Sequence, residues 1–195
     1  MLHSELLASK AKAQTTGVVS LGLEGAYNSV NADILIEILI NLKVPPKITK
    51  FIYNLIRSRN IYGYYNGIKF ASGWTNKGLP QGSCLSPLLF NRYIHYAVNT
   101  ITREVGIIEF ADDIILYSSG FDVDQITVAL EYNVFKLYKF FKQINLSLNP
   151  EKCALIYFNN PNLKNNTMTI NISGQLISNS SDIKYLGIRW QSNLE

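Results

Sequence analysis

Cysteine is scarce in this chain of 195 residues, with only Cys84 and Cys153 present. Two cysteines are too few for a disulfide scaffold or a cysteine-rich zinc site. Charged residues are also few, at 16% of the chain against 47% hydrophobic residues. This balance excludes a disordered chain, a coiled coil and a collagen-like fibre. A chain of this length is expected to form one domain with a sizeable core.

Long apolar segments are missing as well. Residues 1–17 lack the apolar centre of a secretory signal. No uncharged apolar run approaches the roughly 20 residues that a membrane-spanning helix needs. We therefore expect an intracellular and reducing location, without a distinction between nucleus and cytoplasm, and no membrane partner.

Acidic residues are absent between Glu37 and Glu104, although the net charge of the whole chain is only +4. The stretch holds nine lysines and arginines, namely Lys43, Lys47, Lys50, Arg57, Arg59, Lys69, Lys77, Arg92 and Arg103. Aromatic residues are interleaved with them, namely Phe51, Tyr53, Tyr62, Tyr64, Tyr65, Phe70 and Trp74. Nucleic-acid bases can stack on such rings while the cations contact phosphates. A solvated basic face with a tyrosine-rich hairpin explains the same residues, and composition leaves both interpretations open.

The first half of the chain predicts both strands and helices. They are a strand at 18–23, a helix from Asn31 to about Lys43, a helix from Pro46 to about Arg59, and a hairpin at 61–65 and 68–74. Asn31 is a residue type that caps helices, and Pro45 and Pro46 end the first helix. Asn66-Gly67 is a strong signal for the hairpin turn.

The second half continues the mixture. We expect a loop at 78–87, a helix capped by Ser86 that reaches about Ile101, and a hairpin at 105–110 and 114–119. A long helix is expected to follow from Asp122 or Asp124, and then a strand at 153–158. The remainder is expected to form a flexible loop at 159–166 and one hairpin within 167–190. The interleaving indicates an α+β fold, with a sheet and helices packed on one of its faces.

Two adjacent carboxylates, Asp112 and Asp113, lie between apolar β segments in the sequence FADD. Unpaired carboxylates repel each other and are costly to desolvate. A divalent cation would offset that cost, because hard metals bind carboxylate oxygens. An exposed Asp-Asp turn at a hairpin tip explains the same residues. Glu109 is either a third carboxylate near the metals or a solvated strand residue.

The loop GLPQGS (78–83) is the second candidate site. Its two glycines let the backbone approach a ligand closely. Gln81 offers both a donor and an acceptor to the edge of a base or sugar. A plain loop before a helix is the alternative explanation.

These motifs resemble those of reverse transcriptases, specifically those of non-LTR (LINE-type) retrotransposons. The resemblance runs from about Val18 to Trp190, and the motifs follow the family order: LGLEGAYNSV, GLPQGSCLSP, FADD, LSLNPEKC and IKYLGIRW. Reverse transcriptases of group II introns and other bacterial elements are a less close match. The resemblance implies a right-hand polymerase palm, an antiparallel sheet backed by helices, with part of the fingers.

The resemblance also implies an activity, the addition of deoxynucleotides from dNTP to a DNA primer on an RNA template. The family uses two Mg²⁺ ions for this reaction. By motif, Asp112 and Asp113 match the catalytic metal-binding pair, with Asp112 as the principal ligand. Lys152 matches the catalytic lysine that protonates or steadies the pyrophosphate.

The substrate-binding residues follow in the same way. Tyr27 matches the aromatic residue that packs under the deoxyribose and excludes a 2′-hydroxyl. Gln81 and Gly82 match positions along the template and the incoming nucleotide. Tyr185, Leu186 and Gly187 match the primer-grip turn.

The first family motif departs from the pattern at the position of its essential aspartate. Gly22 stands there and Asn28 stands where the family often has a second Asp. A glycine offers only backbone to a metal, so we expect a loss of several orders of magnitude in rate, by analogy with the removal of a triad member. Glu24 lies two residues on, and strand alternation would point it to the same face.

We expect residues 1–17 to be an N-terminal remnant and 18–195 to be the palm, with partial fingers at 31–74 and the primer-grip hairpin near 167–190. The family's N-terminal fingers and its thumb are not found in this sequence, so we expect a truncated domain. One hypothesis is an RNA-directed DNA polymerase, a nucleotidyltransferase. The other is an inactive palm that acts at most as a nucleic-acid-binding module, which we favour because of Gly22.

Overall fold

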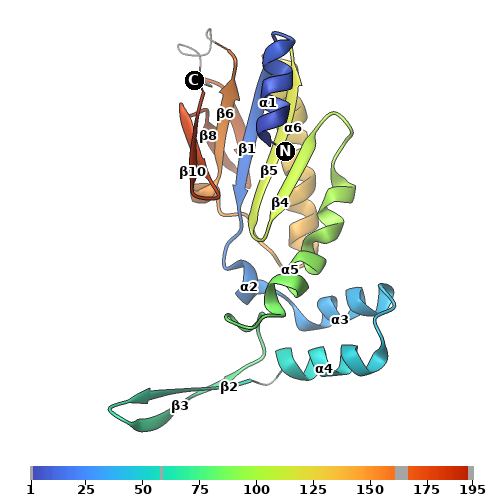
Figure 1. The fold of residues 1–195 in the computed structure, drawn as a ribbon, viewed down its shortest axis with the longest axis vertical. Helices are drawn as coiled ribbons and strands as arrows, with labels where there is room; N and C mark the ends of the chain where they lie inside the picture. Colours follow the sequence, from blue (N-terminus) through green and yellow to red (C-terminus); the bar gives the residue numbers. More distant parts are fainter. Residues whose placement is uncertain (1, 58, 161–166, 193–195) are drawn as a thin grey trace. The chain divides into compact units, whose positions relative to one another are not determined.

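The computed structural model of the protein describes residues 2–57, 59–160 and 167–192 (Figure 1). The chain forms two compact units. The first consists of Met1–Glu24, Tyr96–Gln143 and Ser147–Glu195, and the second of Gly25–His95 and Ile144–Leu146. Residues 161–166 of the predicted flexible loop lie outside the described residues. In the described part, no helix is both long and apolar enough to cross a membrane.

The first unit is built on a four-stranded antiparallel sheet with the order β4-β5-β1-β6. Its strands are β4 (Gly106–Phe110), β5 (Asp113–Gly120), β1 (Thr15–Gly22) and β6 (Ala154–Phe158). The central strand β1 is buried along almost its whole length, in agreement with the short buried strand predicted at 18–23.

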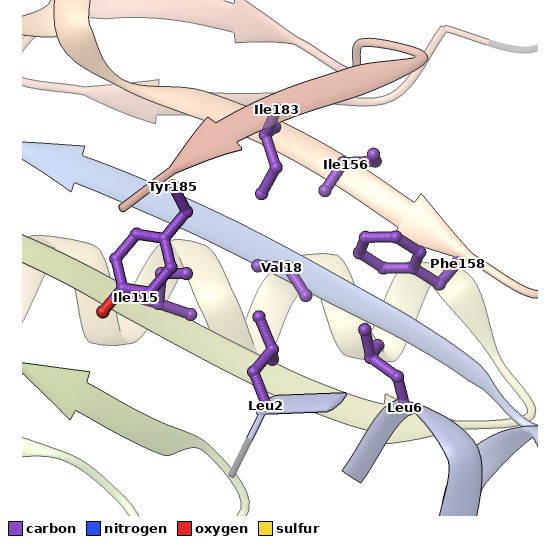
Figure 2. Packing of buried hydrophobic residues seen from close by; sticks show 8 residues of the cluster. All are labelled: Leu2, Leu6, Val18, Ile115, Ile156, Phe158, Ile183 and Tyr185. Carbon is purple, nitrogen blue, oxygen red and sulfur yellow. The ribbon is translucent and has the colours of Figure 1, made fainter. Parts of the chain in front are cut away.

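Helices cover both faces of this sheet. The long helix α6 (Val123–Gln143) packs so closely on one face that a Cβ on Gly17 would lie 2.7 Å from Ile126 Cγ2. Helix α1 (Leu2–Ala11) packs on the opposite face through Leu2 and Leu6 (Figure 2). The prediction of helices on one face only is therefore wrong, because the short sequence before Val18 did not suggest a helix with a buried side.

The core between α1 and the sheet is a cluster of eight buried residues. Its members, shown in Figure 2, are Leu2, Leu6, Val18, Ile115, Ile156, Phe158, Ile183 and Tyr185. They come from α1, from three strands of the sheet and from a strand near the C-terminus, so this cluster joins the two ends of the chain.

The segment after residue 167 forms two hairpins rather than the single predicted one. Strands β7 (Thr169–Ile172) and β8 (Gln175–Ser178) make the first, and β9 (Asp182–Tyr185) and β10 (Ile188–Gln191) make the second. Each turn has two residues with positive φ, Ser173-Gly174 and Leu186-Gly187. The Leu186-Gly187 turn was expected from the primer-grip motif, whereas the Ser173-Gly174 turn was not predicted, although serine and glycine are common turn residues.

The second unit contains the elements α2 (Ala26–Ser29), α3 (Ala32–Asn41), α4 (Pro46–Ile56), β2 (Arg59–Tyr65), β3 (Ile68–Thr75) and α5 (Ser86–Ile94). The Asn31 side chain accepts hydrogen bonds from the amides of Asp33 and Ile34, as predicted for a cap. The Asn66-Gly67 turn joins β2 to β3, also as predicted.

The helix after the GLPQGS loop is shorter than predicted. It ends at Ile94, and residues His95–Thr100 form a 3₁₀ helix (η1), in which Thr100 Oγ1 donates to the Ala97 carbonyl at 2.7 Å. Ser86 does not cap α5 but is its first residue, because its hydroxyl donates instead to the Pro80 carbonyl at 2.6 Å. Local hydroxyl–backbone bonds of this kind compete with regular helix geometry.

Candidate active site

The two carboxylates lie at the tip of the β4–β5 hairpin. Phe110 and Asp113 form the last strand pair, and Ala111 and Asp112 form the turn, with Ala111 at φ 53°. Asp113 is also the register partner of Gly22 on β1. The hairpin thus presents both aspartates at the end of the sheet where β1 ends.

The charge environment of Asp113 shows which groups surround it. The pKa of Asp113 is raised, first by desolvation and second by the negative charge of Asp112. The positive charge of Lys152 acts in the opposite direction. Lys152 therefore lies close enough to Asp113 to interact with it electrostatically.

Gly22 lies directly against the turn that carries Lys152. A Cβ built on Gly22 would lie 2.5 Å from Lys152 Cβ and 3.3 Å from its carbonyl oxygen. The turn, η2 (Pro150–Lys152), is held there because the Asn149 amide donates to the Gly22 carbonyl at 2.9 Å. The φ of Gly22 is not positive, so space rather than backbone conformation excludes a side chain at this position.

Glu24 does not continue the strand alternation that would aim it at the aspartates. Strand β1 ends at Gly22, a single bridge joins Leu23 to Leu148, and Glu24 lies in a bend with an exposed side chain. Within the described residues, no group of three or more acidic, histidine or cysteine side chains could hold a metal ion. The donor set therefore does not fit a pair of divalent cations.

Glu109 is a strand residue and not a third carboxylate on the face of Asp113. Its register partner is Ile114, whereas Asp113 pairs with Phe110, so Glu109 and Asp113 lie on opposite faces of the sheet. Its side chain is half-buried, and its Oε1 is buried without a hydrogen-bond partner in the described structure. Burial raises the pKa of Glu109 to about 7.

The predicted primer-grip residues form the β9–β10 turn, where Leu186 and Gly187 have φ 49° and 80°. Tyr185 is buried in the cluster of Figure 2. Burial raises the pKa of its hydroxyl, and the charge of Asp113 raises it further. The first unit therefore gathers Tyr185, Asp113, Lys152 and Gly22 in one region.

The predicted substrate-binding residues lie in the second unit. Tyr27, on α2, stacks on Phe90 with a centroid distance of 4.9 Å, and its carbonyl accepts from the Leu79 amide at 2.8 Å. A Cβ on Gly78 would lie 2.5 Å from the Tyr27 carbonyl oxygen, so only glycine allows this approach. Gln81 and Gly82 are exposed in the same loop. The structure thus joins Tyr27 to the GLPQGS loop.

With this geometry in view, the class of the protein follows from comparison. The family model described as "Reverse transcriptase (RNA-dependent DNA polymerase)" matches residues 2–190. The chain belongs to the reverse transcriptase family, as its motifs predicted. The match includes α1 in addition to the region from Val18 onward.

The relatives are polymerases of non-LTR retrotransposons. The chain is 25% identical over 214 residues to the Retrovirus-related Pol polyprotein from type-1 retrotransposable element R2 of Popillia japonica, covering 98% of the chain and 34% of the relative. It is 28% identical over 149 residues to the RNA-directed DNA polymerase from mobile element jockey of Drosophila funebris, covering 73% of the chain and 16% of the relative. The chain thus spans about a third or less of these relatives.

Solved structures support the predicted α+β polymerase fold. Apo telomerase from Candida tropicalis, truncated from its C-terminal domain, matches 98% of this chain and 38% of its own, with a TM-score of 0.62 and 12% identity. Telomerase from the same organism in complex with the TWJ fragment of telomeric RNA gives a TM-score of 0.60 at 12% identity, over 98% of this chain and 32% of its own. At this identity the similarity is one of fold.

Proposed function

We propose that this reverse transcriptase domain descends from an enzyme that added deoxynucleotides to a DNA primer on an RNA template, and that it no longer catalyses this reaction. The observation that carries the proposal is the closed position at Gly22, where Lys152 Cβ would lie 2.5 Å from any added Cβ. An aspartate at this position cannot be accommodated unless η2 moves. The position therefore has no room for the carboxylate that the family motif places there.

The metal requirement leads to the same proposal. Reverse transcriptases in general depend on divalent metal ions, and two Mg²⁺ ions serve in the mechanism that the motifs imply. In the family, carboxylates from the first motif and from the FADD motif together offset the repulsion between two such ions. In this chain, Asp112 and Asp113 supply only the carboxylates of the FADD motif. We derive no catalytic step through a metal in this chain.

The remaining residues keep roles in binding. We assign Tyr27, Gln81 and Gly82 to the nucleotide and template, Lys152 to the phosphates of dNTP, and Tyr185 with Leu186 and Gly187 to the primer strand. None of these contacts needs a carboxylate at Gly22, so the chain can retain nucleic acid after catalysis is lost. This is the second candidate function, a nucleic-acid-binding module.

The test measures catalysis and metal binding separately. Primer extension on an RNA template, with Mg²⁺ or with Mn²⁺, is expected to give no product for the chain beside an active reverse transcriptase as the assay control. Calorimetry with Mn²⁺ is expected to show weak binding that Asp112→Asn does not weaken much further. Extension by the unmodified chain, or tight binding that Asp112→Asn abolishes, would show that the site is intact.

A further inference from the structure

The β2–β3 hairpin of the second unit has no buried side chain among those that the structure describes. It nevertheless carries several large apolar and aromatic residues, namely Ile61, Tyr62, Tyr64, Tyr65, Ile68, Phe70 and Trp74. A two-stranded hairpin with neither face covered is only marginally stable in water. A contiguous exposed apolar surface of this kind indicates a binding site.

The register of the hairpin sorts these residues onto two faces. Tyr64 lies opposite Lys69, and Tyr62 lies two residues before Tyr64, so all three share one face. The register shifts between Ile61 and Tyr62, where β3 carries one extra residue, so that Trp74 lies opposite Asn60. Asn60 is two residues before Tyr62 on β2, and Trp74 therefore joins the same face. Tyr65, Ile68 and Phe70 occupy the other face, where the Phe70 ring lies over Gly63.

The two faces differ in where their cation lies. The ammonium of Lys69 lies 3.8 Å from the centroid of the Tyr62 ring, whose centroid is 6.2 Å from that of Tyr64. Arg59 shares the face of Tyr65, Ile68 and Phe70, but it lies at the base of the hairpin and its guanidinium donates to backbone carbonyl oxygens. The face defined by Tyr62, Tyr64, Lys69 and Trp74, called the tyrosine–lysine face below, therefore combines rings with a cation.

We propose that the tyrosine–lysine face binds single-stranded nucleic acid, with bases stacked on its rings and a phosphate beside Lys69. Charge complementarity favours a polyanion, because the acid-free stretch between Glu37 and Glu104 contains the whole hairpin. A second copy of this chain would bring the same positive charge to the contact. The Tyr62 and Tyr64 rings lie edge to face, with centroids 6.2 Å apart. That distance is nearly twice the spacing of about 3.4 Å between bases along one strand of a duplex, so each ring can stack on a base of its own when the bases are splayed apart.

The base of the hairpin is held in place for such a contact. The Arg59 guanidinium donates to the carbonyl oxygens of Lys77 and of Gly78, the latter at 2.8 Å. These bonds tie the start of β2 to the chain just beyond β3. A platform that is ordered before binding loses less conformational entropy on association.

The proposal rests on the proposed function only for the class of partner, and it does not require catalysis. Trp74 supplies a direct readout, since Trp190 is the only other tryptophan and can be replaced in Trp190→Phe. We expect oligo(U) and oligo(dT) to quench Trp74 fluorescence, and a blunt duplex of the same length to quench it far less. A difference between the first two separates RNA from DNA as the natural partner.

Variants of the two faces test the assignment. Tyr64→Ala is expected to weaken single-strand binding by about tenfold or more, because each base–ring stack contributes strongly to affinity. Tyr65→Ala, an equally exposed tyrosine on the other face, is the matched control and is expected to change affinity by less than about twofold. Lys69→Gln should lower the slope of log K against log salt by about 0.7. Lys139→Gln, which removes a lysine over the Phe135 ring of α6, should leave the slope unchanged.

Each contrary result has a distinct meaning. Unchanged binding by Tyr64→Ala, or an equal loss in Tyr65→Ala, would overturn the tyrosine–lysine face while leaving nucleic-acid binding in place. Equal binding of duplex, or preference for anionic lipid vesicles, would overturn the single-strand assignment. Failure of the parent chain to bind any nucleic acid at low salt would count against the proposed binding module as well.

Discussion

Gly22 and Lys152 come from distant segments of the chain and meet where β1 ends. The turn at η2 occupies the space that a side chain on Gly22 would need. Introducing an aspartate at Gly22 would therefore require η2 to move. The energetic cost of that replacement can be measured apart from catalysis.

Gly22→Ala adds only the Cβ and tests this contact. Strand propensity alone predicts that alanine stabilises the fold by about 0.5–1 kcal/mol over glycine. The 2.5 Å approach to Lys152 Cβ predicts the opposite sign, a loss of about 1–3 kcal/mol from overpacking. Urea unfolding gives the sign directly, and the loss should shrink in a Lys152→Gly background. A stabilising Gly22→Ala would refute the contact.

Glu109 predicts a pH dependence of stability. Its pKa is raised from 4.5 to about 7 by burial, so the folded protein holds a proton that the unfolded chain has already released in this window. Stability should therefore fall as the pH rises from about 4.5 to 7. Solvent partly screens this carboxyl, so we expect about 1–2 kcal/mol.

Glu109→Gln isolates this effect from that of Asp113, whose raised pKa acts in the same direction. Urea unfolding at pH 5 and pH 8 should show a smaller decrease for the glutamine variant than for the parent chain. Equal decreases in the two proteins would mean that Glu109 is not desolvated as described.

Among the elements, α1 contributes most beyond what its sequence suggested. Its side chains complete a core cluster with strands from the middle and the end of the chain (Figure 2). The helix has no strong amphipathic pattern, so its packing rests on Leu2 and Leu6 in particular. The expectation of an N-terminal remnant at residues 1–17 overlooked this contribution to the core.

Leu6→Ala and Leu7→Ala form a matched pair on α1. Leu6 is 0% exposed and Leu7 is 48% exposed, so the same chemical change creates a cavity only at Leu6. We expect Leu6→Ala to lower the free energy of unfolding by about 2–5 kcal/mol and Leu7→Ala by less than about 0.5 kcal/mol. Similar decreases in the free energy of unfolding for both variants would mean that Leu6 is not buried and that α1 does not pack on the sheet.

For the whole molecule, the two units differ in how their strands are protected. In the first unit, β1 and β5 are the inner strands of the sheet and are covered on both faces. In the second, the β2–β3 hairpin has exposed side chains on both faces. The element that we assign to nucleic-acid binding is thus also the least protected by packing.

Native-state hydrogen exchange should reflect this difference. We expect the slowest amides in β1 and β5, with exchange close to the global unfolding free energy, and amides of β2 and β3 that exchange orders of magnitude faster. Addition of oligo(U) should slow the hairpin amides selectively. Slow exchange throughout the free hairpin would show that another part of the molecule covers it.

Several elements, including the hairpin that carries Asp112 and Asp113, could be predicted from the sequence because their signals are local. The Asn31 cap, the Asn66-Gly67 turn and the hairpin around Asp112 each depend on a few neighbouring residues and their backbone preferences. The order of the motifs was enough to predict the family that the match over residues 2–190 confirms.

The tertiary structure alone decided the features that depend on distant residues. Strand register separates Glu109 from Asp113, whereas adjacency in sequence suggested a shared site. The packing of η2 closes the position at Gly22, and the pairing of α1 with the sheet places helices on both faces. The physical reason is that local patterns determine which backbone conformation a segment adopts, while register and close packing depend on partners far along the chain.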